Sequence, residues 1–209
     1  MATTDGGYGQ DYECYSVWII FRNREKSYTA RICDGLLCGH SEGLTMQAVV
    51  RADGWVSWQG GRCQAALGAA GVAVHKREGD HATPAGVLRL RRVLYRADRL
   101  PPPQAPGLPR EPLAPDDGWC DESGSADYNR MVRRPHAARH EALWRDDDAY
   151  DVIGVLGWND DPVEKGRGSA IFLHVARPDY ALTEGCVALA LADLLALLAA
   201  GVTSLDVTS

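Results

Sequence analysis

The sequence predicts a mainly β domain with one helix packed on it near the C-terminus. Apolar runs separated by turn residues recur from residue 46 onward, and two of them, 151–158 and 169–176, are nearly continuous. Near-continuous apolar runs of this length are typical of strands buried on both faces. After residue 186 the period changes to a helical one, with leucines at positions i, i+3, i+4 and i+7: Leu191, Leu194, Leu195 and Leu198.

The first strands of this domain are expected to form a hairpin. Residues 47–51 and 54–58 flank an Asp-Gly pair, which is a frequent hairpin turn. Further strands are expected over residues 69–75 and 86–95. The segment from Leu100 to Pro115 carries seven prolines, and proline lacks the amide donor that a sheet ladder requires. We therefore expect a long loop there, and loops of this length are usually functional or mobile.

The C-terminal helix has recognisable ends. Asp193 lies in its first turn, where the helix dipole favours a negative charge. Gly201 follows the last apolar turn, which is the usual place for a glycine that stops a helix. Residues 202–207 are expected to form a last strand.

The chain is long enough for one domain, or one domain with a short extension. Its 209 residues can bury a sizeable core. Residues 1–45 hold three of the six cysteines and only one short apolar run, whereas Met46 opens a segment that has the pattern of a domain start. We expect an N-terminal extension of uncertain role over residues 1–45 and the main domain over residues 46–209.

Charge and targeting signals limit the classes of partner. The formal net charge of −6 gives no electrostatic reason to bind nucleic acid or anionic lipid. No apolar stretch is long enough to span a bilayer, and the first residues lack the basic and apolar regions of a signal peptide. As written, the sequence predicts a cytoplasmic protein, and a periplasmic or cell-wall location only if the true N-terminus differs.

The cysteines are expected to be reduced thiols that bind no metal. Without an export signal, disulfides are not favoured. Cys33 and Cys38 form one loose pair near His40, whereas a tetrahedral zinc site usually takes two close pairs of ligands.

One stretch carries residues suited to covalent chemistry. His174 ends a buried strand, and Gly185 and Cys186 come just before the helix. Thiolates attack carbonyls, and a nearby imidazole lowers the thiol pKa and stores its proton. A neighbouring glycine lets a substrate approach the backbone closely, and amides at such a turn can face a developing oxyanion. Cys186 and His174 are therefore the best candidates for nucleophile and base, while a buried structural cysteine is the alternative interpretation.

These residues resemble the catalytic motif of the L,D-transpeptidases, the YkuD-type domain. In that family a histidine at a strand end is followed by a loop and then by Ser/Thr-x-Gly-Cys, which here is His174 and Thr183-Glu184-Gly185-Cys186. Thr83-Pro84-Ala85-Gly86 is similar to the family's Thr-Pro-x-Gly strand entry, and residues 117–121, 128–132 and 168–174 resemble one branch of the family. The resemblance runs from about Met46 to the C-terminus and does not cover residues 1–45.

The resemblance implies a YkuD-like β-sandwich or barrel that acts on the peptide stems of peptidoglycan. Cys186 would be the nucleophile and His174 the base, with the amides of Gly185 and Cys186 as oxyanion donors. The thiolate would attack the carbonyl of an L-centre residue, usually a diamino acid, and expel the terminal D-Ala. An amine of a second stem would then take the acyl group. No metal or organic cofactor is implied.

Two other functions remain open at this point. Water as acceptor would give an L,D-carboxypeptidase that trims soluble muropeptides in the cytoplasm, and the missing export signal favours it. A catalytically inactive binder of peptidoglycan stems is the third possibility. The chain also departs from the commonest family pattern at Glu184, Ala188 and Val175, which affects the substrate pocket. The charge of Glu184 by itself would raise the pKa of the thiol.

Four further residues are candidates for substrate binding. Thr183 belongs to the cysteine motif, and Ser169 could either line the pocket or hydrogen-bond within the strand. Asn129 and Arg130 could bind the carboxylates of the stem, since arginine presents a planar fork to a carboxylate, or they could form a surface turn.

Overall fold

The computed structural model describes residues 46–209, so the prediction of an N-terminal extension over residues 1–45 lies outside the described residues. The described chain forms fourteen strands and one helix. The strands of its first half are β1 (Met46–Arg51), β2 (Trp55–Trp58), β3 (Gly61–Ala66), β4 (Val72–Ala73), β5 (Thr83–Pro84), β6 (Gly86–Tyr95) and β7 (Arg110–Pro112). The second half contains β8 (Asp117–Cys120), β9 (Met131–Arg133), β10 (His140–Ala142), β11 (Val152–Leu156), β12 (Phe172–Val175), β13 (Val187–Leu189), α1 (Leu191–Ala199) and β14 (Val202–Thr208).

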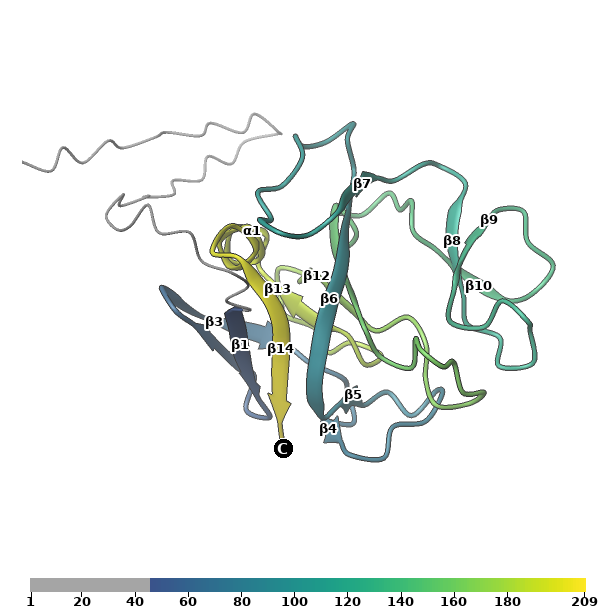
Figure 1. The fold of residues 1–209 in the computed structure, drawn as a ribbon, viewed down its shortest axis with the longest axis horizontal. Helices are drawn as coiled ribbons and strands as arrows, with labels where there is room; N and C mark the ends of the chain where they lie inside the picture. Colours follow the sequence, from purple (N-terminus) through teal and green to yellow (C-terminus); the bar gives the residue numbers. More distant parts are fainter. Residues whose placement is uncertain (1–45) are drawn as a thin grey trace, which may run out of the picture. The chain divides into compact units, whose positions relative to one another are not determined.

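Nine of these strands form one sheet that closes on itself. Its order is β11-β12-β13-β3-β2-β1-β14-β6-β7, and β6 also pairs with β11. The closing pair joins eight strands into a barrel without an open edge, and β7 is added on the outside of this ring. Figure 1 shows β14 and β6 running side by side, with α1 seen end-on near one end of β14. The predicted mainly β fold with one C-terminal helix is therefore confirmed.

The inside of the barrel is an apolar core. Leu88 of β6, Leu173 of β12 and Leu205 of β14 are buried there together with one face of α1. That face consists of Leu194, Leu197 and Leu198, which have no exposed surface. Burying each such side chain stabilises the fold by about 1.5–3 kcal/mol.

The helix ends as the sequence predicts. The amide of Gly201 donates to the carbonyl of Leu198, and Gly201 has a φ of +81°, in the left-handed region that glycine adopts without strain. This helix is not long and apolar enough to cross a membrane.

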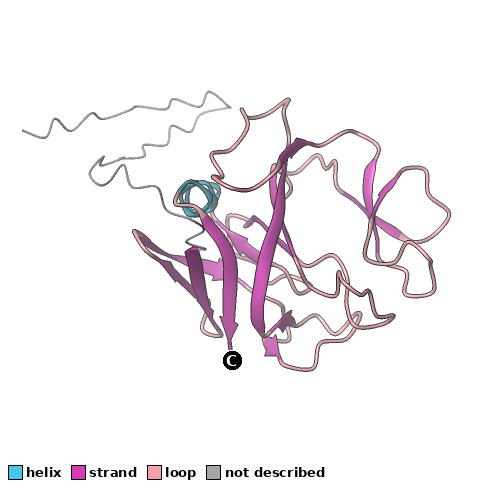
Figure 2. Ribbon diagram, in the orientation of Figure 1, coloured by secondary structure: helices cyan, strands magenta, loops and turns pink. Residues whose placement is uncertain are grey.

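A second apolar cluster, called here the outer layer, covers the opposite face of β6, β11 and β12. Successive residues of a strand point to opposite faces. Leu173 and Val175 of β12 accordingly lie in the barrel core, whereas Phe172 lies in the outer layer with Cys186. The outer layer is completed by residues of the segment 96–150, which also forms the small sheet β10-β8-β9. Figure 2 shows that loops make up most of this part of the molecule.

Two sequence predictions differ from the structure. Most of the strand expected over residues 69–75 is turn, and only the two residues of β4 pair, with β5. Gly71 has a φ of +78°, which interrupts an extended strand. The proline-rich segment, expected to be loop throughout, contains the short strand β7. This strand lies at the edge of the sheet, where the missing amide of Pro112 breaks no ladder.

Candidate active site

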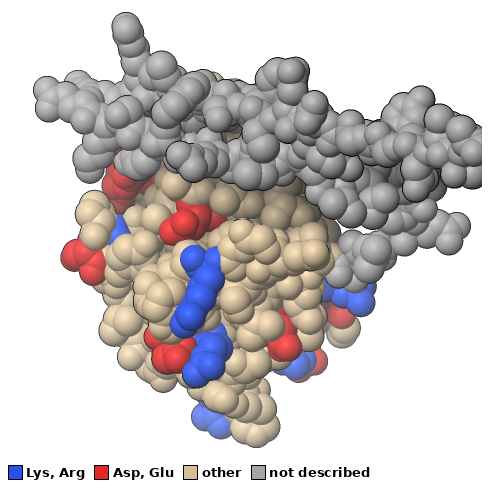
Figure 3. Space-filling model, turned by 90° about the vertical axis from the view of Figure 1, so that its left-hand side faces the viewer, with Lys and Arg blue, Asp and Glu red and all other residues tan. Residues whose placement is uncertain are grey.

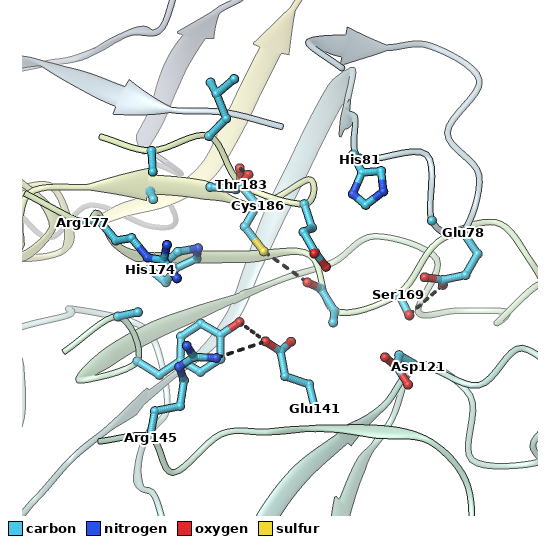
Figure 4. A pocket seen from close by; sticks show the side chains of 18 of the residues that line it. Glu78, His81, Asp121, Glu141, Arg145, Ser169, His174, Arg177, Thr183 and Cys186 are labelled. Atoms are coloured by element: carbon cyan, nitrogen blue, oxygen red, sulfur yellow. Dashed lines mark hydrogen bonds and ion pairs between the residues drawn. The ribbon is translucent and has the colours of Figure 1, made fainter. Parts of the chain in front are cut away.

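A cavity of about 460 Å³ lies beside the outer layer and is lined by both Cys186 and His174. Its walls come from residues 76–81, from β12 and the turn before β13, and from the loop around β10. The volume lies in the range of pockets that bind small ligands. Figure 4 shows the Cys186 sulfur and the His174 ring facing this space.

The two candidate catalytic side chains come from neighbouring parallel strands. Leu173 of β12 lies opposite Val187 of β13, and His174 lies opposite Ala188. Because alternate residues of a strand share a face, Cys186, which precedes β13, projects to the same side as Ala188 and His174. Parallel pairing therefore brings together two residues that are twelve positions apart in the sequence.

A network of hydroxyl hydrogen bonds holds the turn that presents Cys186. The Thr183 hydroxyl donates to the Cys186 carbonyl at 2.7 Å and accepts from the Gly185 amide at 3.2 Å. The hydroxyl of Thr83, which is fully buried, also donates to the Cys186 carbonyl at 3.4 Å. Thr183 thus lines the cavity, as expected for a site residue, but its hydroxyl group is used to shape the turn.

Glycine is required at position 185 by the backbone. Gly185 has a φ of +135°, and a Cβ atom there would lie 2.8 Å from the carbonyl oxygen of Ala82. The family resemblance implied that its amide is an oxyanion donor, but in this structure the amide already donates to Thr183. The geometry gives Gly185 a conformational role.

The thiol of Cys186 is held in its neutral form. Its Sγ donates to the carbonyl of Ala170 at 3.3 Å and accepts from the amide of Phe172 at 3.4 Å. Burial raises the pKa of Cys186 to about 12, and the charges of Glu141 and Glu184 act in the same direction. The Phe172 amide and Lys76 lower the pKa but do not outweigh burial. In the resting site the pKa of the thiol therefore lies above its usual value; Glu184 raises it as expected, and the lowering by the imidazole stays a prediction.

The imidazole of His174 is neutral as well. Burial lowers the pKa of His174; its hydrogen bond with the Val175 carbonyl opposes this, and Arg145 lowers the pKa further. Nδ1 lies 3.0 Å from the Val175 carbonyl oxygen, which can only accept a hydrogen bond, so Nδ1 carries the proton and Nε2 the lone pair. The site thus combines a neutral thiol with a neutral base.

Three side chains that sequence reasoning missed surround the histidine. The ring of Tyr150 meets that of His174 edge to face, with centroids 5.3 Å apart. Its hydroxyl donates to Oε1 of Glu141 at 2.6 Å, and Arg145 lies 3.9 Å from the same oxygen. Burial raises the pKa of both Glu141 and Tyr150. No motif in residues 141–150 signals that Tyr150 lies against His174.

Ser169 lies at the cavity wall, as one of its two interpretations predicted. Its hydroxyl donates to Oε2 of Glu78 at 2.7 Å, and the hydroxyl of Tyr128 donates to the same oxygen. Glu78 was not selected from the sequence, although it lies only five residues before the Thr83-Pro84-Ala85-Gly86 motif.

Asn129 and Arg130 are not brought to the cavity. Asn129 is buried, and Arg130 is exposed and does not line the cavity. The carboxamide of Asn129 makes four hydrogen bonds, with the carbonyls of Trp158 and Asn159, the indole of Trp119 and the amide of Ala170. No donor or acceptor remains for a substrate carboxylate. Because Ala170 accepts the hydrogen bond of the thiol, Asn129 supports the site indirectly.

The comparison with protein families agrees with the motif. The family model of the L,D-transpeptidase catalytic domain, YkuD, matches residues 44–203. No curated protein matches the chain. Among solved structures, an L,D-transpeptidase from Mycobacterium smegmatis is similar with 14% sequence identity and a TM-score of 0.33. That match covers 78% of this chain and 58% of the solved chain, so this chain spans less than two thirds of it.

Proposed function

Because the chain belongs to the YkuD family of L,D-transpeptidase catalytic domains, we propose that Cys186 and His174 form the catalytic pair of an L,D-transpeptidase acting on peptidoglycan stems. The observation that carries this proposal is the placement of both side chains on one face of β12 and β13, toward one cavity. A buried structural cysteine would have no reason to share a cavity with a neutral imidazole.

The first half of the reaction breaks the peptide bond before the terminal D-residue. Nε2 of His174 takes the proton of the Cys186 thiol as Sγ bonds to the carbonyl carbon of the L-centre residue. The resulting tetrahedral intermediate collapses, the C–N bond breaks, and the imidazolium returns the proton to the leaving amine. A thioester at Cys186 and a free D-amino acid result. Since both groups start neutral, proton transfer accompanies the attack and no thiolate is stored beforehand.

The second half of the reaction transfers the acyl group to an amine. A neutral amine of a second stem attacks the thioester carbonyl and gives its proton to His174, and the Cys186 sulfur leaves and recovers that proton. The cavity wall carries four carboxylate side chains, those of Glu78, Asp121, Glu141 and Glu184. The same wall carries Lys76, Arg145 and Arg177, so its charge does not by itself select an amine over water, and the family to which the chain belongs is what favours transfer to an amine.

The proposal is tested by incubating the full chain with a tetrapeptide muropeptide and measuring product masses. Loss of D-Ala together with cross-linked dimers is expected. Loss of D-Ala without dimers would identify an L,D-carboxypeptidase, and binding without any mass change would identify an inactive stem binder. Cys186→Ala should abolish turnover. Cys63→Ala is the matched control, because Cys63 is also a buried thiol with a pKa raised to about 12, but it lies in the barrel core.

A further inference from the structure

Charged side chains are distributed unevenly over the walls of the cavity. Figure 4 shows Arg145 and Arg177 on the same side of the Cys186 sulfur as His174, Glu78 and Asp121 on the other side, and Glu141 next to Arg145. The surface in Figure 3, which lies over β1, β2 and β3, instead has charges of both signs interspersed among uncharged residues. The cation on the acidic side of the cavity, Lys76, is already paired with Asp80.

The two arginines differ in whether they already have a partner. Arg145 makes two hydrogen bonds to the carboxylate of Asp147, at 2.8 and 2.7 Å, and lies over the Tyr150 ring. Arg177 is exposed, and within residues 46–209 no carboxylate oxygen lies within 4.0 Å of its guanidinium nitrogens. Arg177 therefore presents an unpaired planar cation at the cavity, two residues after the end of β12.

The proposed reaction indicates which group of the substrate lies near Arg177. His174 must return a proton to the leaving nitrogen, so the leaving residue lies on the His174 side of the sulfur. The carboxylate carbon of that residue is only two bonds from the same nitrogen. A carboxylate placed on the opposite side would meet Glu78 and Asp121 and be repelled, because the cation there, Lys76, is paired with Asp80. The free carboxylate of the leaving residue is thus directed to the wall that holds Arg177.

We propose that Arg177 binds the C-terminal carboxylate of the leaving residue and restricts the enzyme to stems that end in a free acid. This inference rests on the proposed function and names a specificity-determining residue of the same site. A guanidinium offers two parallel donors to the two oxygens of a carboxylate, and a carboxamide has only one acceptor oxygen and no charge.

A simpler role would need only the positive charge of Arg177. Arg177 also borders a shallow hollow lined by Asp147, Asp148 and Asp179, and its charge could serve only to offset theirs. Arg177→Lys, measured in the same way as the variants below, keeps that charge without the planar fork, so a charge-only role would leave its acid-to-amide ratio of kcat/KM equal to that of the wild type. The test therefore compares two substrates that differ only at the C-terminal carboxylate.

The experiment uses a stem tetrapeptide ending in D-Ala and the same peptide ending in D-alanine amide. Rates of release of the terminal residue are measured as kcat/KM for the wild type, Arg177→Gln and Arg89→Gln. Arg89 is the matched control because it is exposed on β6 and does not line the cavity. We expect the wild type and Arg89→Gln to prefer the acid by roughly tenfold or more, as for a hydrogen bond to a charged group. Arg177→Gln should lose this preference through slower turnover of the acid alone.

An acid-to-amide ratio in Arg177→Gln equal to that of the wild type would overturn the inference while leaving the proposed function intact. If the wild type releases the terminal residue from neither peptide, the proposed function fails, and the inference about Arg177 is then tested by measuring peptide binding. Binding of both peptides is then measured with Cys186→Ala and with Cys186→Ala/Arg177→Gln. Tighter binding of the acid that disappears with Arg177→Gln supports the carboxylate site, and equal binding of acid and amide to both proteins rejects it.

Discussion

The two faces of strand β12 belong to two regions that differ in polarity. Leu173 and Val175 point into the barrel, where packing is apolar and the hydrogen-bonding groups are those of the ladders. Phe172 and His174 point the other way, to the outer layer and the cavity, where ionisable groups are buried among loops. One strand therefore contributes to stability on one side and to the proposed chemistry on the other.

The barrel strands and the segment 96–150 contribute to the site in different ways. The barrel fixes the register of β12 and β13, and that register sets the relative position of His174 and Cys186. The segment 96–150 adds Glu141 and Arg145, whose charges shift the pKa values of Cys186 and His174, and Tyr150, whose ring contacts that of His174. Sites held on paired strands keep their geometry more closely than sites held on loops.

The largest expected effect is on the cavity face. His174→Gln removes the base, and release of the terminal residue should slow by about a hundredfold to ten-thousandfold, the usual contribution of general base catalysis. The midpoint of thermal unfolding should stay close to that of the wild type. Steady-state kinetics and circular dichroism check both expectations. A His174→Gln variant with the full wild-type rate would contradict the assignment of the catalytic base to the cavity face of β12.

The adjacent residue on the barrel face should behave in the opposite way. Leu173→Ala leaves a void in the core and should lower the free energy of unfolding by about 2–5 kcal/mol. Turnover per folded molecule should change little, because the side chain does not line the cavity. Chemical denaturation and active-site titration measure the two quantities. Unchanged stability with a large loss of rate would contradict the assignment of this face.

A smaller effect is expected at the turn that joins the two regions. Gly185→Ala places a Cβ atom against the Ala82 carbonyl at a φ of +135°, which costs about 1–3 kcal/mol and displaces Cys186. Gly107→Ala is the control, since Gly107 has a φ of +77° but an open surrounding. Both stability and the rate of thiol alkylation should fall further for Gly185→Ala. Equal effects of the two substitutions would show that the close approach to Ala82 is unimportant.

The smallest effect concerns charge in the cavity. Glu141→Gln removes a negative charge that raises the pKa of Cys186, so the thiol pKa should fall and alkylation by iodoacetamide at pH 8 should accelerate by about three- to tenfold. In the wild type the rate should still rise between pH 8 and 10, because a thiol with a pKa of about 12 is mostly protonated there. Glu164→Gln, an exposed carboxylate outside the cavity, should leave the rate unchanged. A rate that is already constant above pH 7 would refute the neutral resting thiol.

The barrel could be predicted from the sequence to the extent that burial leaves a periodic pattern. Residues 151–158 were located as a strand because their apolar run is nearly continuous, and residues 86–95 because valine and leucine recur along a segment bounded by turn residues. The three-residue strand β13 was not, since so short a run resembles the start of the helix that follows it. The strands of the small sheet, β8, β9 and β10, were missed because runs of three or four residues are too short to show a period.

The site could be predicted only where residue type and local order carry the chemistry. Cys186 and His174 share one motif, so the sequence alone indicated them. Tyr150 and Arg177 belong to no recognised motif. They reach the cavity through tertiary folding, which their positions in the sequence do not indicate. The raised pKa of the thiol could not be predicted, because it depends on how deeply the sulfur is buried among Phe172 and its neighbours.

The most direct test of the account is the mass of the protein itself during turnover. The full chain is mixed with the stem tetrapeptide, quenched in acid within the first turnover, and digested for peptide mapping. The account predicts that the acyl group of the stem, without its terminal D-Ala, is attached to Cys186 and that it is absent from Cys186→Ala. Release of D-Ala by Cys186→Ala at the wild-type rate, or an acyl group on any other residue, would contradict it.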